Sequence, residues 1–244
     1  MWLSLSLVDD HIEPYEPYNP LDERNLAQSV ADALEREPIR SLPPDPFAGP
    51  GLYALYFVGS TGLYAPLGEL CRRGANADLG VGPDAVPIYV GKATASGSRH
   101  GNLRNSKDKT LSDRIRKHTR SIEMATSTLK ITDFRVRYLR VKDIWIPLGE
   151  FGLLQRYTPI WNRVLDGFGN NDPGRGRYEQ ARSPWDTLHP GRRWAEKLPV
   201  NPEPRERLEA KVRKAMNAIV SRFPIPEDVL ADEPSYDLTG SGEI

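Results

Sequence analysis

Glu150 is an acidic residue on the side of a predicted helix that is otherwise apolar. In residues 146–157, helical spacing places Ile146, Leu153 and Leu154 on the same face as this glutamate. Burying an unpaired carboxylate is unfavourable, so such a group usually pairs with a cation or binds a metal ion. Both interpretations stay open, because the chain has many arginines that could supply an ion pair.

Arg114 and His118 lie one helical turn apart, so their side chains can reach a common point. Arginine stabilises negative charge that develops on a phosphate, and an imidazole can orient or accept a proton. The alternatives are a core histidine with satisfied hydrogen bonds and an exposed helix arginine. The pair is therefore a candidate for phosphate chemistry.

Tyr53 and Tyr89 each lie in a predicted strand that is flanked by glycine, within GLYALYFV (51–58) and PIYV (87–90). A tyrosine in a strand is normally a packing residue. Here a GLY triplet is followed downstream by a YVG triplet, and this pairing makes both tyrosines candidates for one site.

The elements that must position these side chains alternate between strands and helices. A glycine-rich connection (59–82) joins the first two strands without room for a regular crossover, which indicates an antiparallel pair. A capping box, Thr110–Asp113, predicts a helix in which Leu111, Ile115 and His118 share a face, followed by a strand at 131–141 and the helix at 146–157. This order predicts an α+β fold, a small and mainly antiparallel sheet flanked by helices, with N- and C-terminal extensions.

The chain divides into five predicted segments. They are a disordered N-terminus (1–20), a helical extension (21–48), an α+β core that holds the candidate residues (49–165), a C-terminal extension with an amphipathic helix near 206–222 (166–223) and a disordered acidic tail (224–244). The C-terminal extension is the candidate for DNA contacts or dimer packing.

The formal net charge is zero, but the charges are unevenly distributed. Residues 91–140 carry 13 bases and 4 acids, whereas residues 1–50 carry 3 bases and 10 acids. Folding can gather the basic middle on one face, where counterion release would favour nucleic acid. Charge alone fits a solvated surface equally well.

Bulk composition excludes several classes of protein. The single cysteine, Cys71, excludes a disulfide framework and a thiolate zinc site. No apolar run approaches the roughly 20 residues that span a bilayer, and the N-terminus lacks the basic region of a signal peptide. We therefore expect a cytoplasmic protein with no membrane association.

The spacing of these residues resembles the GIY-YIG nuclease superfamily. Gly51-Leu-Tyr53 and Tyr89-Val-Gly91 match its two signature triplets, and Arg114, His118, Glu150 and Asn162 follow in the expected order. The stretches PIYVGKA, LSDRIRKH, WNRVLDGFGN, PGRGR and HPGRRWAEK are similar to the type II restriction endonuclease branch that cuts the palindrome CCGCGG (isoschizomers of SacII). This similarity covers roughly residues 40–197.

The resemblance implies a role for each matching residue. Tyr53 and His118 would handle the proton of the attacking water, with either one as the base, and Tyr89 would contact the scissile phosphate or the water. Arg114 would stabilise the phosphorane-like charge. Glu150 would be the single protein ligand of Mg²⁺ or Mn²⁺, which polarises the phosphate. The remaining two residues would assist: Lys92 as the basic residue after the second triplet, and Asn162 as a hydrogen-bonding residue that holds the geometry.

Base recognition is predicted for the basic loop 96–109 and the segment 170–193. Arginine reads guanine bidentately in the major groove, and the candidates are Arg99, Arg104, Arg175 and Arg177, which could equally bind phosphates. Three large aromatic residues, Phe168, Trp185 and Trp194, are predicted to be core or dimer contacts.

The resemblance also implies partners. Cutting both strands of a palindrome in double-stranded DNA favours a homodimer whose symmetry matches that of the site, and a cognate DNA methyltransferase would protect the host. The alternatives are a GIY-YIG nuclease for repair or homing, a catalytically silent DNA-binding protein on the same scaffold, and an RNA-binding module, which would expose aromatic pairs on a sheet.

Overall fold

A four-stranded antiparallel sheet forms the centre of the protein, in the order β1-β4-β2-β3. The computed structural model describes residues 19–75, 80–94, 109–174, 176 and 178–231. The strands are β1 (Arg40–Ser41), β2 (Gly51–Phe57), β3 (Tyr89–Ala93) and β4 (Phe134–Arg140). The α+β class predicted from the sequence is confirmed.

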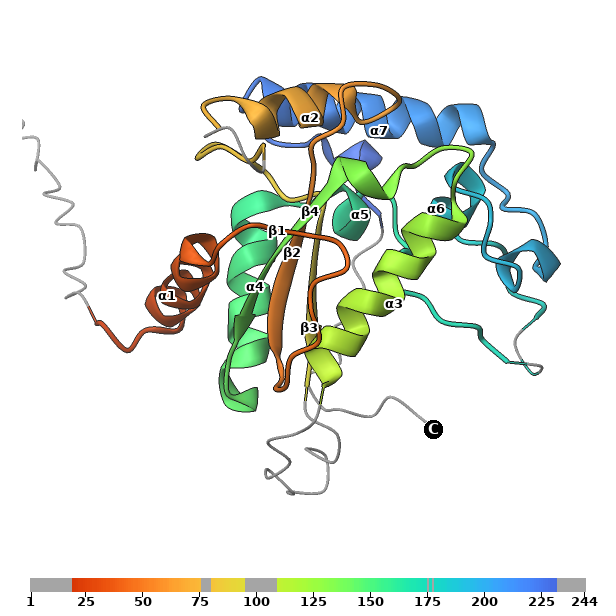
Figure 1. Cartoon of the computed structure of the whole chain (residues 1–244). Coiled ribbons are helices and arrows are strands. Elements are labelled where there is room, and N and C mark those ends of the chain that lie inside the picture. Colours follow the sequence, from red (N-terminus) through yellow and green to blue (C-terminus); the bar gives the residue numbers. More distant parts are fainter. Residues whose placement is uncertain (1–18, 76–79, 95–108, 175, 177, 232–244) are drawn as a thin grey trace, which may run out of the picture.

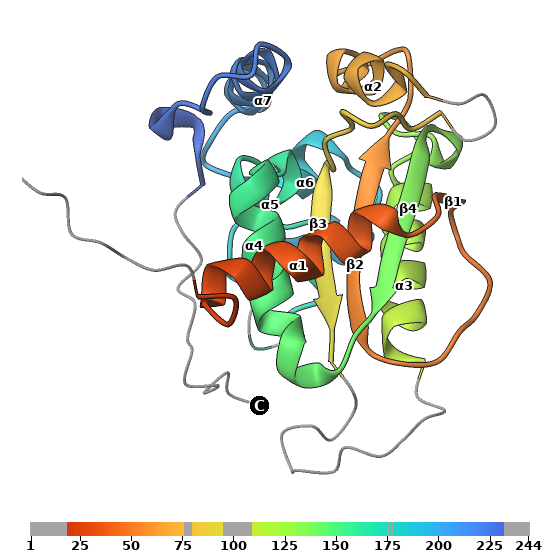
Figure 2. The same cartoon turned by 90° about the vertical axis from the view of Figure 1, so that its left-hand side faces the viewer.

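Helices cover both faces of this sheet (Figures 1 and 2). On one face lie α1 (Glu23–Arg36) and α4 (Ile146–Tyr157), and on the other lies α3 (Thr110–Met124). Every residue of the central strand β2 is buried as a result, which explains why GLYALYF is almost wholly apolar rather than alternating.

Two glycines allow α1 and α4 to pack closely on the sheet. A Cβ at Gly149 would overlap the side chains of Leu52 and Val30, and one at Gly152 would crowd the backbone of Ala27. This close packing fixes the height at which α4 presents Glu150 beside β3. The N-terminal helix is therefore part of the layer that positions the site.

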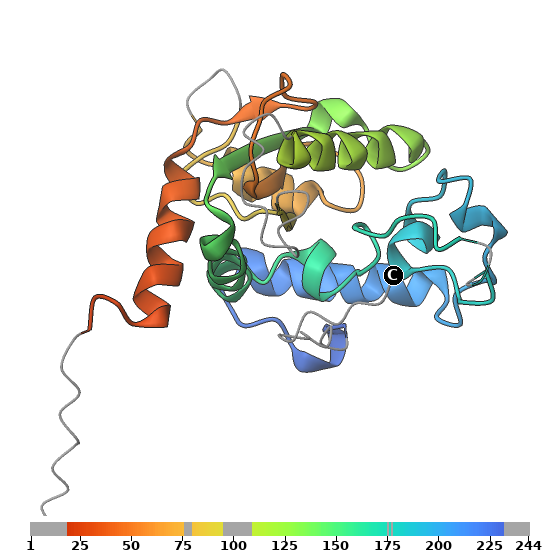
Figure 3. The same ribbon diagram turned by 90° about the horizontal axis from the view of Figure 1, so that it is seen from below.

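The remaining helices gather at the end of the sheet where β2 ends, and beyond its β3 edge (Figures 1 and 3). They are α2 (Ala65–Arg72), α5 (Ile160–Arg163), α6 (Pro184–Leu188) and α7 (Arg205–Val220). Leu208, Val212 and Met216 of α7 join the same apolar core as the strands. The C-terminal extension therefore packs on the core of residues 49–165, and the two form one continuous apolar interior.

Several sequence predictions differ from the structure in detail. The glycine-rich connection contains helix α2, whose apolar side was hidden by its shortness and by Pro66 and Gly68. Strand β1 was not predicted and lies within the predicted helical extension, and β3 starts and ends later than predicted. The prediction of a capping box is wrong, because Thr110 is already helical and its buried hydroxyl bonds to none of the described residues.

The boundary predicted at residue 224 is too early. Residues Glu227–Val229 form a 3-10 turn, Val229 is buried, and the amide of Ala231 donates to the carbonyl of Arg163 at 2.6 Å. Folded structure therefore extends to residue 231. In the part of the chain that the structure describes, no helix is long and apolar enough to cross a membrane.

Candidate functional site

Tyr53 and Tyr89 lie side by side on β2 and β3, on the face of the sheet that α3 covers. Their ring centroids are 6.0 Å apart. A Cβ on Gly91, directly across from Tyr53 in the strand register, would overlap the Tyr53 ring and hydroxyl. The last glycine of the YVG triplet is therefore needed to make room for the tyrosine of the GLY triplet.

Helix α3 brings His118 and Arg114 to the same pair of tyrosines. The imidazole centroid lies 5.7 Å from the Tyr53 ring and 5.2 Å from the Tyr89 ring. Arg114, one turn earlier, is half-buried and acts electrostatically on both hydroxyls. Four of the residues predicted from the sequence thus converge at one place.

Two buried polar atoms in this cluster lack partners. Neither the Tyr53 hydroxyl nor His118 Nε2 makes a hydrogen bond of good geometry with any described residue, although Arg114 and Tyr89 lie close to the hydroxyl. Native proteins leave few buried polar groups unsatisfied, and those few call for an explanation such as a partner that binds there. The cluster has the character of a binding or reaction site.

The same burial sets the protonation states. Loss of hydration raises the pKa of Tyr53 well above its usual value, with the neighbouring Tyr89 adding to the shift and Arg114 opposing it. Burial also lowers the pKa of His118 well below its ordinary value, and the positive charge of Arg114 lowers it further. At neutral pH the hydroxyl is protonated and the imidazole is neutral.

A loop from the C-terminal extension, Gly167–Asn170, closes over this cluster. Phe168 stacks on the His118 ring with centroids 4.4 Å apart and an interplanar angle of 25°. The carbonyl of Gly169 accepts a hydrogen bond from Arg114 at 3.2 Å. This loop was not predicted as part of the site, and Phe168, predicted only as a core or dimer contact, is buried against the imidazole.

Glu150 and Lys92 form a second group on the opposite face of the sheet, beside the β3 edge. Lys92 Nζ lies 2.7 Å from Glu150 Oε2, and the glutamate side chain is 12% exposed. The charge of Glu150 also reaches Tyr89, whose pKa it helps to raise after the larger effect of burial. Strand β3 therefore carries a residue of each group, Tyr89 on one face and Lys92 on the other. The ion-pair partner of Glu150 is a lysine rather than an arginine.

Asn162 holds the outer edge of β3 in register. Its side-chain amide donates to the carbonyl of Val90 at 2.9 Å, and its Oδ1 accepts from the Val90 amide at 2.8 Å. The residue therefore acts like one more strand pair on the outer edge of β3, next to Tyr89. It positions the strand through the backbone of Val90.

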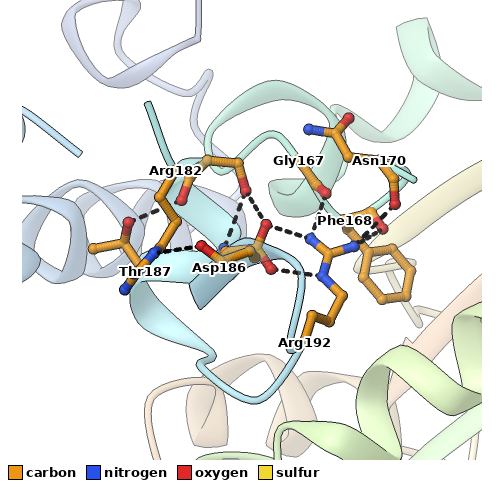
Figure 4. Close-up of polar contacts among 9 residues, drawn as sticks. Gly167, Phe168, Asn170, Arg182, Asp186, Thr187 and Arg192 are labelled. Atoms are coloured by element: carbon orange, nitrogen blue, oxygen red, sulfur yellow. Dashed lines mark hydrogen bonds and ion pairs between the residues drawn. The ribbon is translucent and has the colours of Figure 1, made fainter. Parts of the chain in front are cut away.

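All four residues that were predicted to read DNA bases lie outside the described residues: Arg99, Arg104, Arg175 and Arg177. Arg192, at the end of the predicted segment 170–193, is 2% exposed and is bonded to the loop that covers His118 (Figure 4). It cannot contact DNA, so the prediction for this segment does not extend to Arg192.

The antiparallel sheet with two neighbouring tyrosines, an arginine–histidine helix and a glutamate on α4 is the arrangement that the resemblance to GIY-YIG nucleases implies. The family of the Eco29kI GIY-YIG domain, a restriction endonuclease family, matches residues 45–216. Because this match covers most of the chain, the protein belongs to that family and its substrate is DNA. No curated protein sequence matches the chain. The matched range runs well past 165 and includes the Gly167–Asn170 loop.

Proposed function

We propose that the protein is a type II restriction endonuclease that hydrolyses both strands of double-stranded DNA at the GC-rich palindrome CCGCGG. The observation that carries a catalytic function is the pair of buried atoms without partners, Tyr53 Oη and His118 Nε2, beside Arg114. A silent DNA-binding protein would have no need to gather a tyrosine, a histidine and an arginine at one buried place. The proposed sequence preference rests on stretches such as PGRGR and HPGRRWAEK.

In the proposed reaction, His118 accepts the proton of the attacking water, directly or through the Tyr53 hydroxyl. The buried imidazole is neutral at pH 7, whereas the buried tyrosine keeps its proton, so the imidazole is the better acceptor. A scissile phosphate bound beside it would raise the pKa of His118 towards neutrality, because a nearby anion favours the imidazolium.

Arg114 and Tyr89 would bind the phosphate that is attacked. Arg114 donates to the Gly169 carbonyl at 3.2 Å and lies within hydrogen-bonding reach of the Tyr53 and Tyr89 hydroxyls. With five N–H donors, its guanidinium group keeps donors for a ligand there. Negative charge that grows on the phosphate in the transition state is then stabilised by a guanidinium already in position.

The residues around Glu150 fit one Mg²⁺ or Mn²⁺ ion. Lys92 lies 2.7 Å from one carboxylate oxygen, and the glutamate side chain remains partly exposed. Across those residues, no three His, Cys, Asp or Glu side chains gather as a metal cage, and Mg²⁺ commonly uses one or two carboxylates together with water and substrate oxygens. When bound, such an ion would polarise the phosphate and stabilise the leaving oxygen. Lys92 would hold the carboxylate in place.

A homodimer would match the two-fold symmetry of the palindrome, with one site for each strand. A host that makes this enzyme would also need a cognate DNA methyltransferase. Both partners belong to the proposal, as does a cytoplasmic location.

The direct test uses two plasmids that differ only in one CCGCGG site, with Mg²⁺ or with EDTA. We expect metal-dependent cleavage of the first plasmid alone. Fragments from both plasmids would contradict the sequence preference and favour a repair or homing nuclease. No cleavage of either plasmid, with DNA binding retained, would favour the silent DNA-binding protein.

A further inference from the structure

Arg192 is a fully buried arginine whose five N–H donors are all used. Nε and Nη2 donate to the two carboxylate oxygens of Asp186 at 2.5 and 2.6 Å. Nη2 also donates to the carbonyl of Gly167 at 2.8 Å, and Nη1 donates to those of Phe168 and Asn170 at 3.2 and 3.1 Å (Figure 4).

The rings of two tryptophans pack against the guanidinium group of Arg192. Its central carbon lies 4.6 Å from the ring centroid of Trp185 and 4.8 Å from that of Trp194. Asp186 is itself held by the Ser183 hydroxyl at 2.7 Å. The guanidinium group of Arg192 is therefore held firmly in place while it binds three carbonyls of the loop.

The loop that it holds has little order of its own. Residues 166–170 have no helix or strand, and Gly167 has a φ of +100°, in the region that favours glycine. Among the described residues, the carbonyls of Gly167–Asn170 accept hydrogen bonds from Arg192 and Arg114, apart from one backbone bond between Asn170 and Gly167. The Trp185 amide holds the preceding Asp166 carbonyl at 3.0 Å, and the Phe168 ring packs on Trp161 and Trp185. Arg192 therefore supplies most of the hydrogen bonds that fix the backbone of this loop.

We propose that Arg192 is a positioning residue for DNA cleavage, acting through the Gly167–Asn170 loop on Arg114 and His118. This inference rests on the proposed function. Between two carbonyls that Arg192 holds lies Gly169, whose own carbonyl orients Arg114. Phe168, whose carbonyl it binds, packs on the His118 ring. A small shift of this loop displaces both groups, and misplacement by about 1 Å can lower a rate about 10²-fold.

The test compares Arg192→Lys with Arg72→Lys under single turnover on a duplex that contains the site. Lysine keeps the charge opposite Asp186 but has too few donors to hold three carbonyls. We expect the cleavage rate to fall about 10- to 100-fold while the Kd for DNA changes less than about twofold. Arg72 is the matched control, because it also holds two loop carbonyls, of Val58 and Gly59, but contacts none of the site residues.

A double-mutant cycle separates positioning from a general loss of structure. In an Arg114→Ala background, Arg192→Lys should cause a smaller loss of rate than in the wild type, because part of its effect passes through Arg114. Hydrogen exchange should be faster at the Asn170 amide of Arg192→Lys than in the wild type. A full multiplicative loss in the double variant would contradict the proposed route through Arg114.

A second variant keeps the proposal testable if Arg192→Lys does not fold. A methyl group at Gly169 would lie 3.1 Å from the Tyr89 hydroxyl and 3.4 Å from Arg114 Nη2 without touching Arg192. Gly169→Ala should also lower the rate, and a wild-type rate would show that the loop position is unimportant. If the wild type cuts and Arg192→Lys cuts equally fast, the role of Arg192 is wrong; a wild type that cuts no DNA overturns the proposed function, and the role of Arg192 with it.

Discussion

Two buried clusters of tyrosine and histidine lie among the residues that the structure describes, and they differ in how their polar atoms are hydrogen-bonded. In the first, Tyr64 and His189 are bonded at 2.7 Å, Trp161 Nε1 donates to the Tyr64 hydroxyl at 2.9 Å, and Thr128 Oγ1 lies 2.9 Å from His189 Nδ1. In the second cluster, Tyr53 Oη and His118 Nε2 have no partner among the described residues.

Burial affects the two clusters in the same way. It raises the pKa of Tyr64 and of Tyr53 and lowers the pKa of both histidines. The clusters differ instead in the hydrogen bonds that their buried atoms make. The hydrogen-bonded Tyr64–His189 cluster contributes to stability. In the proposed function, the Tyr53–His118 cluster keeps its polar atoms available for hydrogen bonds to a substrate.

The largest expected difference between the clusters is in the rate of DNA cleavage. His118→Asn should lower the rate about 10³-fold, because it removes the proposed proton acceptor. His189→Asn should leave the rate of the folded protein unchanged. Single-turnover cleavage with saturating enzyme checks this pair, and equal losses in the two variants would abolish the distinction between the clusters.

Gly91→Ala should damage the Tyr53–His118 cluster through packing alone. The added methyl overlaps the Tyr53 ring and hydroxyl, so the ring must move from the site, and we expect a loss in rate of about 10²-fold. Gly68→Ala is the control, since a Cβ there would also cause an overlap, with the Gly59 carbonyl, but would meet none of the site residues; its folded protein should keep the wild-type rate. Full activity of Gly91→Ala would show that the position of Tyr53 does not matter.

The two tyrosines should differ in their contribution to stability. Tyr64→Phe leaves Trp161 Nε1 and His189 Nε2 buried without their partner, which should lower the free energy of unfolding by about 2–3 kcal/mol. Tyr53→Phe removes a hydroxyl that has no partner, so stability should stay the same or rise slightly. Urea denaturation of both variants measures this, and equal destabilisation would contradict the comparison.

The smallest expected effect is on the pH dependence of stability. The pKa of His189 is lowered to about 3, mainly by burial and then by Arg205 and Arg192, whereas an unfolded histidine titrates near 6.5. As pH falls below 6.5 the unfolded chain binds a proton that the folded protein excludes, so His189 lowers stability by about 1.4 kcal/mol per pH unit down to its folded pKa.

Unfolded histidine is already half protonated at pH 6.5, so His189→Asn should reduce the loss of stability between pH 6.5 and pH 5.5 by about 1 kcal/mol. Urea denaturation at the two pH values gives both slopes. An unchanged slope would mean that His189 is not a neutral, buried imidazole.

The sequence predicted the site residues better than their surroundings. Tyr53, Tyr89, Arg114 and His118 converge because regular strands and a regular helix carry them, and the periodicity of such elements can be read directly. The position of Glu150 on the apolar side of α4 was predicted for the same reason, although the sequence could not show that Lys92 would be its partner.

The Gly167–Asn170 loop and Arg192 could not be predicted in this way. The loop has no periodic pattern, and its position depends on an arginine 22 residues further along the chain. An arginine in a glycine-rich, basic segment is normally exposed, so the natural prediction was DNA contact. The neighbouring tryptophans and Asp186 were the available signal, since aromatic residues and an acid near an arginine can form a buried ion pair.

The measurement that tests the nuclease site most directly is binding and cleavage of one CCGCGG duplex by Glu150→Gln in the presence of Mg²⁺. Glu209→Gln, which alters a surface ion pair on α7, is the control. We expect Glu150→Gln to bind the duplex with nearly wild-type affinity and to cut it at least about 10³-fold more slowly, while Glu209→Gln does both normally. Cleavage by Glu150→Gln at the wild-type rate would show that the chemistry takes place elsewhere.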